Sequence, residues 1–312
     1  MHTLAIIGAT GFLGRHLVAE CISQGRFKLR LLLRNQNTFE HLQSNMVTIC
    51  DGDILIPESL KGFLQPNSTL IHLAYINNAV AANIEATLNL IEAVKQSGVK
   101  RVVYCSTAVV VGFNAKGIVT ENTMPAPKGE YQETKYRIEE ILRVELPPNV
   151  ELAILRPTEI IGPGGQGLQG MIKRLHYGRN YKNFIYHCIL ESRRFNYVSV
   201  YNVVAALILL ASTPIKQMGE SYNISDDDDA DNNYASVEKI ISSNFKRKQV
   251  YPFAIGLPRY FLSLLFKLLP NHAPPNRIYS YSKIASLGYR KVITLNSAIS
   301  EIVSLEAKSA HS

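Results

Sequence analysis

A short apolar run and the turn that directly follows it, with three glycines at three-residue spacing, constrain the fold more than any other feature of this chain. Residues 4–7 are apolar and rich in β-forming side chains, which predicts a strand buried within a parallel sheet. Gly8, Gly11 and Gly14 follow directly, and a helix is expected over residues 15–24. A strand, a glycine turn and a helix in that order are typical of the start of a doubly wound α/β sheet.

The same glycine turn also predicts a ligand. It brings backbone N–H groups and a helix N-terminus to a place where a pyrophosphate can lie. The spacing is G-x-x-G-x-x-G, which matches the standard G-x-G-x-x-G fingerprint only in kind. A purely structural turn is the alternative. We favour dinucleotide binding, because the strand and the helix that the motif requires are present on its two sides.

The second and third predicted strands end at residues that would face the adenosine half of such a ligand. The strand over residues 29–33 ends at Arg34, where a Rossmann fold reads the ribose. An acidic residue there suits NAD and an arginine suits the 2′-phosphate of NADP. Arg34 therefore favours NADP, with NAD possible, and a solvated arginine is the alternative. Asp53, after the strand over 47–50, could accept from the adenine amino group, although acidic loop residues are common.

Two further strands, over residues 70–74 and 101–105, bring small and hydroxylated side chains to the same edge of the sheet. Ala74 is small enough to let a cofactor pass close to the backbone. Ser106 and Thr107 follow the later strand, and ligands of open sheets bind beyond the carboxyl ends of strands. His72 lies inside an apolar strand, which predicts a hydrogen-bonded core histidine and not a ligand.

Tyr131 and Lys135 are the candidate proton-transfer pair. They stand four residues apart, on one face of a predicted helix, so the ammonium can lie beneath the phenol. A nearby cation favours the phenolate, and we expect it to lower the pKa of the tyrosine. An ordinary helix surface with a snorkelling lysine is the alternative.

Taken in order, these segments resemble the extended short-chain dehydrogenase/reductase family of nucleotide-sugar epimerases, dehydratases and reductases. The resemblance covers nearly the whole chain. The motifs that carry it are the glycine turn, Asp53-Ile54, His72-Leu73-Ala74, Ser106-Thr107 through Val110-Val111-Gly112, Tyr131 to Lys135, Leu155-Arg156-Pro157 and Ile161-Gly162-Pro163-Gly164.

The resemblance implies an α/β fold, a Rossmann-type doubly wound parallel sheet with a smaller, discontinuous C-terminal substrate domain. We expect residues 1–165 to form the NAD(P)-binding domain, with 194–212 returning to it. Residues 166–193 and 213–312 are expected to form the substrate domain.

The resemblance also implies roles for individual residues. Thr107 matches the catalytic hydroxyl that polarises the substrate carbonyl, Tyr131 the acid/base, and Lys135 the lysine that binds the nicotinamide ribose. Pro157 and Thr158 would border the nicotinamide. The predicted cofactor-binding residues are Gly8, Thr10, Gly11, Phe12, Leu13, Gly14, Arg34, Asp53, Ile54, Leu73, Ala74, Tyr131, Lys135, Pro157 and Thr158.

The substrate side is less clearly marked. Arg194 is preferred over Arg193 as the arginine that sugar-nucleotide members place on a diphosphate, and two surface arginines are the alternative. The chain departs from the family at Val111, usually tyrosine, and at Asn202, often aspartate. Dehydratases carry an Asp-Glu pair where this chain has Ala108-Val109, so sugar 4,6-dehydration is not expected. The segment over residues 74–83 is shorter than in typical sugar epimerases.

Composition limits the classes of ligand and partner that this protein is expected to bind. The formal charge of +8 comes from scattered basic residues, which favours phosphate-bearing small molecules over nucleic acid. The four cysteines share no C-x-x-C spacing, so neither zinc nor a redox pair is expected. The acidic run 226–229 lacks the spaced ligands of a calcium site, so no metal is expected there. The run is predicted to be a solvated loop.

We expect a cytoplasmic homodimer with no signal peptide and no membrane span. In the family, the helix predicted over 83–96 and the one carrying Tyr131 commonly pair with their copies in a second subunit. The apolar segment 253–269 is too short and too interrupted to span a bilayer. It is expected to cap the substrate or to meet a partner.

The expected activity is NAD(P)-dependent chemistry at a keto or hydroxyl carbon of a nucleotide sugar, by a 4-keto reductase or an epimerase. One alternative is an NADPH-dependent reductase of a small hydrophobic ketone, like the flavonol-reductase and hydroxysteroid branches. The other is a non-catalytic dinucleotide sensor, against which the intact Thr107, Tyr131 and Lys135 argue.

Overall fold

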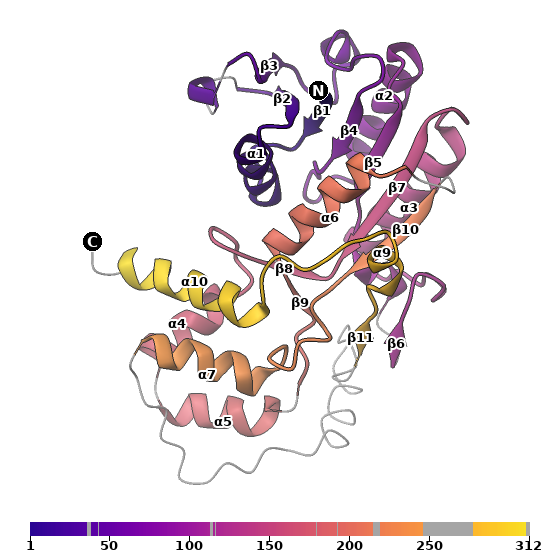
Figure 1. Ribbon diagram of the computed structural model, residues 1–312. Helices are drawn as coiled ribbons and strands as arrows, with labels where there is room; N and C mark the ends of the chain where they lie inside the picture. Colours follow the sequence, from indigo (N-terminus) through magenta and orange to yellow (C-terminus); the bar gives the residue numbers. More distant parts are fainter. Residues whose placement is uncertain are drawn as a thin grey trace. The chain divides into compact units, whose positions relative to one another are not determined.

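The computed structural model describes residues 1–35, 39–42, 44–112, 115, 117–178, 180–191, 193–214, 219–245 and 277–309 (Figure 1). The chain forms two compact units, each with its own core. The first comprises Met1–Val110, Pro127–Arg156 and Val204–Tyr222. The second comprises Val111–Ala126, Pro157–Val203 and Asn223–Ser312.

The first unit is built on a seven-stranded sheet of order β10-β7-β5-β4-β1-β2-β3. The registers that join β3, β2, β1, β4, β5 and β7 are all parallel. The order reverses between β1 and β4, which confirms the predicted doubly wound Rossmann-type sheet. The strands are β1 His2–Ile7, β2 Phe27–Leu33, β3 Val47–Asp51, β4 Thr69–His72, β5 Arg101–Cys105, β7 Glu151–Pro157 and β10 Glu220–Ile224.

Helices cover both faces of this sheet (Figure 1). They are α1 Phe12–Gln24, α2 Val80–Ser97, α3 Glu130–Glu145 and α6 Val200–Ser212, joined by the short 3-10 helices η2 Glu40–Leu42, η3 Pro57–Leu60 and η4 Ala108–Val111. Along β1, Ala5 and Ile7 pack in one core with Leu90 of α2 and Ile138 of α3. Successive strand residues face opposite sides, so Leu4 and Ile6, both fully buried, belong to the other face. Parallel strands covered on both sides explain the continuous apolar runs of the sequence.

A buried ion pair ties α3 to the sheet. Arg156 of β7 donates from Nε to Oε1 of Glu139 at 2.9 Å and from Nη2 to Oε2 at 2.5 Å. Both residues are almost inaccessible to water. Removing one partner of such a pair leaves an uncompensated buried charge and costs roughly 3–5 kcal/mol. The pair therefore fixes the helix that carries Tyr131 and Lys135.

The second unit has a smaller core. Leu168, Ile172, Tyr197, Tyr234 and Leu295 are among its buried members. Its elements are β6 Ile118–Val119, β8 Glu159–Ile161, α4 Gln169–Tyr177, α5 Asn180–Leu190, β9 Tyr197–Ser199, α7 Tyr234–Asn244, β11 Ile278–Tyr279, α9 Ser282–Ala285 and α10 Leu295–Ser309. Strand β8 pairs with β9 and β11 with β6, both in parallel.

The compact units divide the chain differently from the expected boundaries. Residues 111–126 and 157–165 belong to the second unit, and the stretch that returns to the first is 204–222, not 194–212. The roles assigned to the two domains stay predictions. The apolar segment 253–269 lies outside the described residues.

The expectation of a solvated loop at the acidic run is wrong for its first half. Asp226 and Asp227 are buried, and their carboxylates accept hydrogen bonds from the backbone N–H of Ser199 and Tyr279. Asp228 is exposed and pairs with Lys291. The first two aspartates therefore organise the second unit.

Candidate active site

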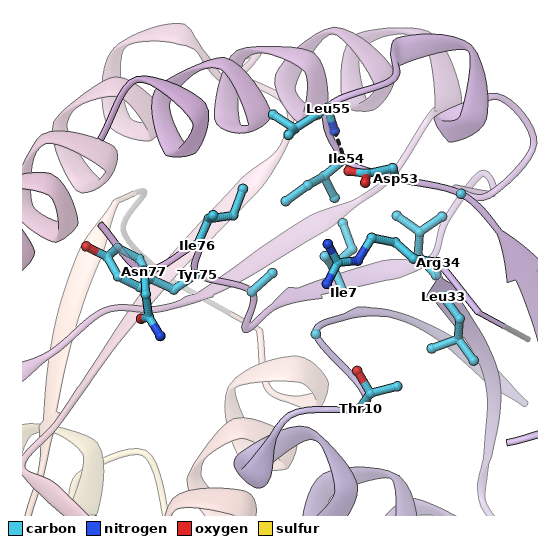
Figure 2. A pocket seen from close by; sticks show the side chains of 14 residues that line it. Ile7, Thr10, Leu33, Arg34, Asp53, Ile54, Leu55, Tyr75, Ile76 and Asn77 are labelled. Atoms are coloured by element: carbon cyan, nitrogen blue, oxygen red, sulfur yellow. Dashed lines mark hydrogen bonds between the residues drawn. The ribbon is translucent and has the colours of Figure 1, made fainter. Parts of the chain in front are cut away.

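A cavity of about 380 Å³ opens at the carboxyl ends of β1 to β4 (Figure 2). It is lined by residues that follow those four strands, beside the point where the strand order reverses. Such a switch point is where open α/β sheets bind ligands. The predicted cofactor residues that line it are Gly8, Thr10, Arg34, Asp53, Ile54 and Ala74.

The glycine turn is too tight for any other residue. Gly8 has φ +86°, and a Cβ atom there would lie 2.7 Å from the backbone nitrogen of Ala74. A Cβ atom on Gly14 would lie 2.1 Å from the carbonyl oxygen of Gly8. Gly11 is the N-cap of α1 and has no side chain to satisfy the first N–H groups of the helix. Phe12 and Leu13 begin that helix, so the turn offers uncapped donors where a pyrophosphate would bind.

Arg34 and Asp53 lie on the same side of this pocket. Figure 2 shows the Arg34 side chain reaching into the cavity, between Asp53 and Thr10. Within the described part of the chain, no carboxylate pairs with its guanidinium. Asp53 is held by its loop, since its Oδ1 accepts from the backbone N–H of Leu55 at 2.9 Å. These residues fit the adenosine half of a dinucleotide, with a free cation available for a 2′-phosphate.

Thr107, Tyr131 and Lys135 lie together beyond the end of β5. The Thr107 hydroxyl lies close enough to Tyr131 to influence the pKa of its phenol. One helical turn after Tyr131, the buried ammonium of Lys135 donates to the carbonyl oxygen of Cys105 at 2.9 Å. The structure therefore assembles all three residues that the resemblance marks as catalytic.

The expected lowering of the tyrosine pKa is wrong. Partial desolvation of the phenol raises the pKa of Tyr131 to about 12, although 45% of the residue's surface is accessible, and the nearby Thr107 hydroxyl only partly opposes that shift. Burial also lowers the pKa of Lys135 to about 8. The ammonium turns toward the Cys105 carbonyl, and its charge is not among the groups that shift the phenol. Tyr131 is therefore a protonated phenol at neutral pH.

Sequence reasoning missed Tyr75, which connects the cofactor pocket to the catalytic group. Its ring lines the pocket and meets the ring of Tyr131 edge-on, with centroids 5.1 Å apart. The Lys135 Nζ atom lies 5.1 Å from the Tyr75 ring centroid and 5.0 Å from that of Tyr104. The ammonium is therefore held between two aromatic faces. Tyr75 directly follows Ala74 in the sequence, but an aromatic residue just after a strand has no distinctive pattern.

His72 is a core histidine, as predicted, but its Nδ1 finds no hydrogen-bond partner among the described residues. Its ring packs on that of Tyr104, with centroids 5.4 Å apart. Burial, and then the charge of Lys135, lower its pKa to about 3. His72 is therefore a neutral imidazole packed beneath the lysine.

The other predicted site residues belong to different surroundings. Leu73 donates its backbone N–H to Ile7 at 2.9 Å, which extends the pairing of β4 with β1. Pro157 ends β7, and Thr158 donates its backbone N–H to Ile224 at 3.1 Å. Arg194 is half-buried in the second unit and donates to the carbonyl oxygen of Asp227 at 2.9 Å. The binding roles of these residues stay predictions.

Two absences hold for the part of the chain that the structure describes. No group of three or more histidine, cysteine, aspartate or glutamate side chains is arranged to hold a metal ion. No described helix is long and apolar enough to cross a membrane.

Known proteins resemble this chain in sequence over part of its length. The sterol demethylase protein B of Methylococcus capsulatus is 28% identical over 172 residues, which cover 52% of each chain. The N-acetyl-alpha-D-glucosaminyl-diphospho-ditrans,octacis-undecaprenol 4-epimerase of Escherichia coli O157:H7 is 28% identical over 201 residues, 58% of each chain. The chain thus spans little more than half the length of these curated relatives.

Solved structures share the whole fold. The UDP-glucose 4-epimerase of Thermotoga maritima, solved with UDP-glucose, superposes with a TM-score of 0.74 at 19% identity and covers 99% of this chain and 100% of its own. The Bordetella bronchiseptica enzyme WbmG, solved with NAD and UDP, gives 0.74 at 17% identity, over 99% of this chain and 96% of its own.

The NAD dependent epimerase/dehydratase family model matches residues 4–225, which include the glycine turn, the Tyr131–Lys135 pair and the sheet of the first unit except the first two residues of β1. The chain therefore belongs to that family, within the extended short-chain dehydrogenase/reductases that its motifs resemble.

Proposed function

We propose that this protein moves a hydride between a nicotinamide coenzyme and a hydroxyl- or keto-bearing carbon, with Tyr131 as the acid/base. The observation that carries the proposal is the assembly of Thr107, Tyr131 and Lys135 in the same unit as the glycine-turn pocket. A sensor of dinucleotides would need only the pocket. The retained proton-transfer group therefore favours an enzyme.

Thr107 and Tyr131 have different roles at the substrate oxygen. Thr107 donates one hydrogen bond to that oxygen, and Tyr131 transfers a proton to it as negative charge develops there. The bound coenzyme supplies the hydride. Because the pKa of Tyr131 is about 12, the phenol holds its proton at neutral pH and is ready to give it to a carbonyl.

We propose a nucleotide sugar as substrate, altered by 4-keto reduction or by epimerisation. The undecaprenol-linked N-acetylglucosaminyl 4-epimerase among the relatives supports this class. The second candidate substrate is a hydrophobic ketone, which the sterol demethylase relative favours. The two substrate classes are distinguished by comparing the turnover of UDP-linked 4-keto sugars with that of 3-keto sterols, using the same coenzyme.

Replacing Tyr131 by phenylalanine is expected to abolish turnover and leave coenzyme affinity within a few-fold of the wild type. Only the oxygen that carries the proton is lost. Turnover and a coenzyme titration check both halves of this expectation. Tyr136→Phe, which removes a hydroxyl from another tyrosine of the same helix, serves as the matched control. Retention of most activity by Tyr131→Phe would exclude Tyr131 as the acid/base.

The charge of Lys135 gives a pH dependence of known sign. Its pKa of about 8 means that the ammonium is present below that pH and is lost as the pH rises through it. Coenzyme affinity and rate should both fall above about pH 8, because the neutral amine binds a ribose hydroxyl more weakly. Lys135→Ala should weaken both at every pH and remove this dependence. A profile that is flat through pH 9 in the wild type contradicts the assignment.

Tyr75 is expected to position the catalytic pair through its ring. Cation–π and aromatic contacts each contribute roughly 0.5–2 kcal/mol, so Tyr75→Leu should lower kcat by roughly tenfold and weaken coenzyme binding. Tyr75→Phe keeps the ring and should stay within about threefold, on the same energetic argument. Tyr177→Leu, which removes an exposed ring of α4, is the control. Equal losses in the Phe and Leu variants would show that the hydroxyl, not the ring, matters.

We also propose a cytoplasmic homodimer formed through α2 and α3. The four cysteines are free, as expected where thiols stay reduced. Leu88 of α2 and Val144 of α3 are exposed apolar side chains, with 45% and 76% of their surfaces accessible. Light scattering at micromolar concentration should give the mass of a dimer, and Leu88→Arg should shift it toward the monomer. A monomeric wild type would contradict this proposal.

The coenzyme separates a reductase from an epimerase. A reductase must exchange its coenzyme, whereas family epimerases commonly retain a tightly held NAD. Arg34 can make a charge-assisted contact with a 2′-phosphate, which contributes roughly 1.5–3 kcal/mol. That predicts a roughly ten- to hundredfold preference for NADPH over NADH. Titration of both coenzymes against the wild type and Arg34→Ala measures it. Equal affinities of the wild type for the two coenzymes, or a preparation saturated with NAD, would contradict the reductase and favour the epimerase.

A further inference from the structure

The first unit has a second and larger cavity, of about 570 Å³, at the opposite edge of its sheet. His2, Phe27, Thr69 and Arg101, which line it, are the first residues of β1, β2, β4 and β5. Because these strands are parallel, their starts lie at the edge away from the coenzyme pocket. We call this space the amino-edge cavity. It is separate from the site described above.

The lining of the amino-edge cavity is basic. Arg26, Lys100 and Arg101 contribute cationic groups, and none of the described residues that line it carries a carboxylate. Arg26 and Lys100 are exposed, and neither has an ion-pair partner in the described part of the chain. The guanidinium of Arg26 lies over the Phe27 ring, 4.8 Å from its centroid, which holds the charge at the mouth of the cavity.

The floor of the cavity is built from fixed polar groups. Arg101 is only 5% exposed and donates from Nη1 to the carbonyl oxygens of Leu210 and Ala211, at 3.1 and 2.8 Å. Its Nε donates to Glu151 at 2.7 Å, so the charge of Arg101 is balanced. The cationic surplus therefore belongs to Arg26 and Lys100.

Beside them, a histidine and a threonine form a short hydrogen-bonded chain. The Thr69 hydroxyl donates to the carbonyl oxygen of Ala211 at 3.4 Å, and His2 Nε2 lies 2.8 Å from the same hydroxyl oxygen. With that hydroxyl proton committed, His2 Nε2 is the donor to Thr69. These bonds keep the walls of the cavity in place without a ligand.

We propose that the amino-edge cavity binds a phosphate-bearing small molecule through Arg26 and Lys100. Arg26 precedes β2 and Lys100 precedes β5, with β1 and β4 between them in the sheet, so the two unpaired cations suit a ligand with more than one anionic group. Charge-assisted hydrogen bonds to phosphate oxygens are among the strong ones. The volume exceeds that of the coenzyme pocket, so it accommodates more than a bare anion. The proposal does not depend on the activity proposed for the other edge.

Titration calorimetry of the full chain with inorganic pyrophosphate tests this assignment. Arg26→Gln/Lys100→Gln should weaken binding by at least roughly tenfold, since each variant removes a charge-assisted contact. Lys61→Gln/Lys173→Gln removes the same net charge from exposed positions elsewhere and should leave binding within twofold. Saturating NADPH is present throughout, so that the coenzyme pocket, where the glycine turn would bind a pyrophosphate, does not contribute to the titration. Thermal unfolding of each variant confirms that it folds.

Three outcomes would overturn the proposal. The first is no measurable binding of pyrophosphate by the wild type at millimolar concentration. The second is an equal loss in the two double variants, which would mean a nonspecific effect of net charge. The third is citrate binding as tightly as pyrophosphate, which would mean that the cavity selects anions in general and not phosphate. Tighter binding of pyrophosphate than of inorganic phosphate is the expected result.

Discussion

The site depends on how closely three backbone segments approach one another at the β1–α1 turn. Gly8 meets Ala74 and Gly14 meets the Gly8 carbonyl at distances that exclude any Cβ atom. That approach seats the N-terminus of α1 directly over the ends of β1 and β4. The uncapped N–H groups, Arg34 and Tyr75 then face one cavity because the backbone leaves no other arrangement. A single methyl group at Gly8 or Gly14 would force the surrounding backbone atoms to shift.

The proton-transfer group depends on a second constraint, the burial of charge beneath α3. Lys135 is only 4% exposed, and its ammonium is stabilised by one carbonyl oxygen and two aromatic rings. A carbonyl oxygen and two rings stabilise the charged form less than bulk water does, so the pKa of the lysine falls to about 8. The buried pair of Arg156 and Glu139 holds the helix in place against this cost. The fold thus maintains a charged lysine that is close to losing its proton.

The sequence predicted those parts of the molecule that local chemistry determines. Apolar runs and glycines located the strands and the turn at Gly8, because burial and positive φ leave few alternatives. Tyr75 was missed because an aromatic residue after a strand has no distinctive pattern. Its importance comes from Tyr131 and Lys135, which lie more than fifty residues further along the chain. The direction of the Tyr131 pKa shift failed for the same reason, since burial is a property of the tertiary structure.

The acidic run shows why composition alone misled. Four consecutive aspartates are typical of a solvated loop, yet Asp226 is buried with an amide donor supplied from far away in the sequence. Asn202 donates from Nδ2 to both carboxylate oxygens of Asp226, at 2.9 and 3.1 Å, and its Oδ1 accepts from Val292 at 2.9 Å. An aspartate at position 202 could not donate and would place two carboxylates together. Asn202 and the buried Asp226 therefore complement each other, because the amide supplies the hydrogen bonds that the buried carboxylate needs.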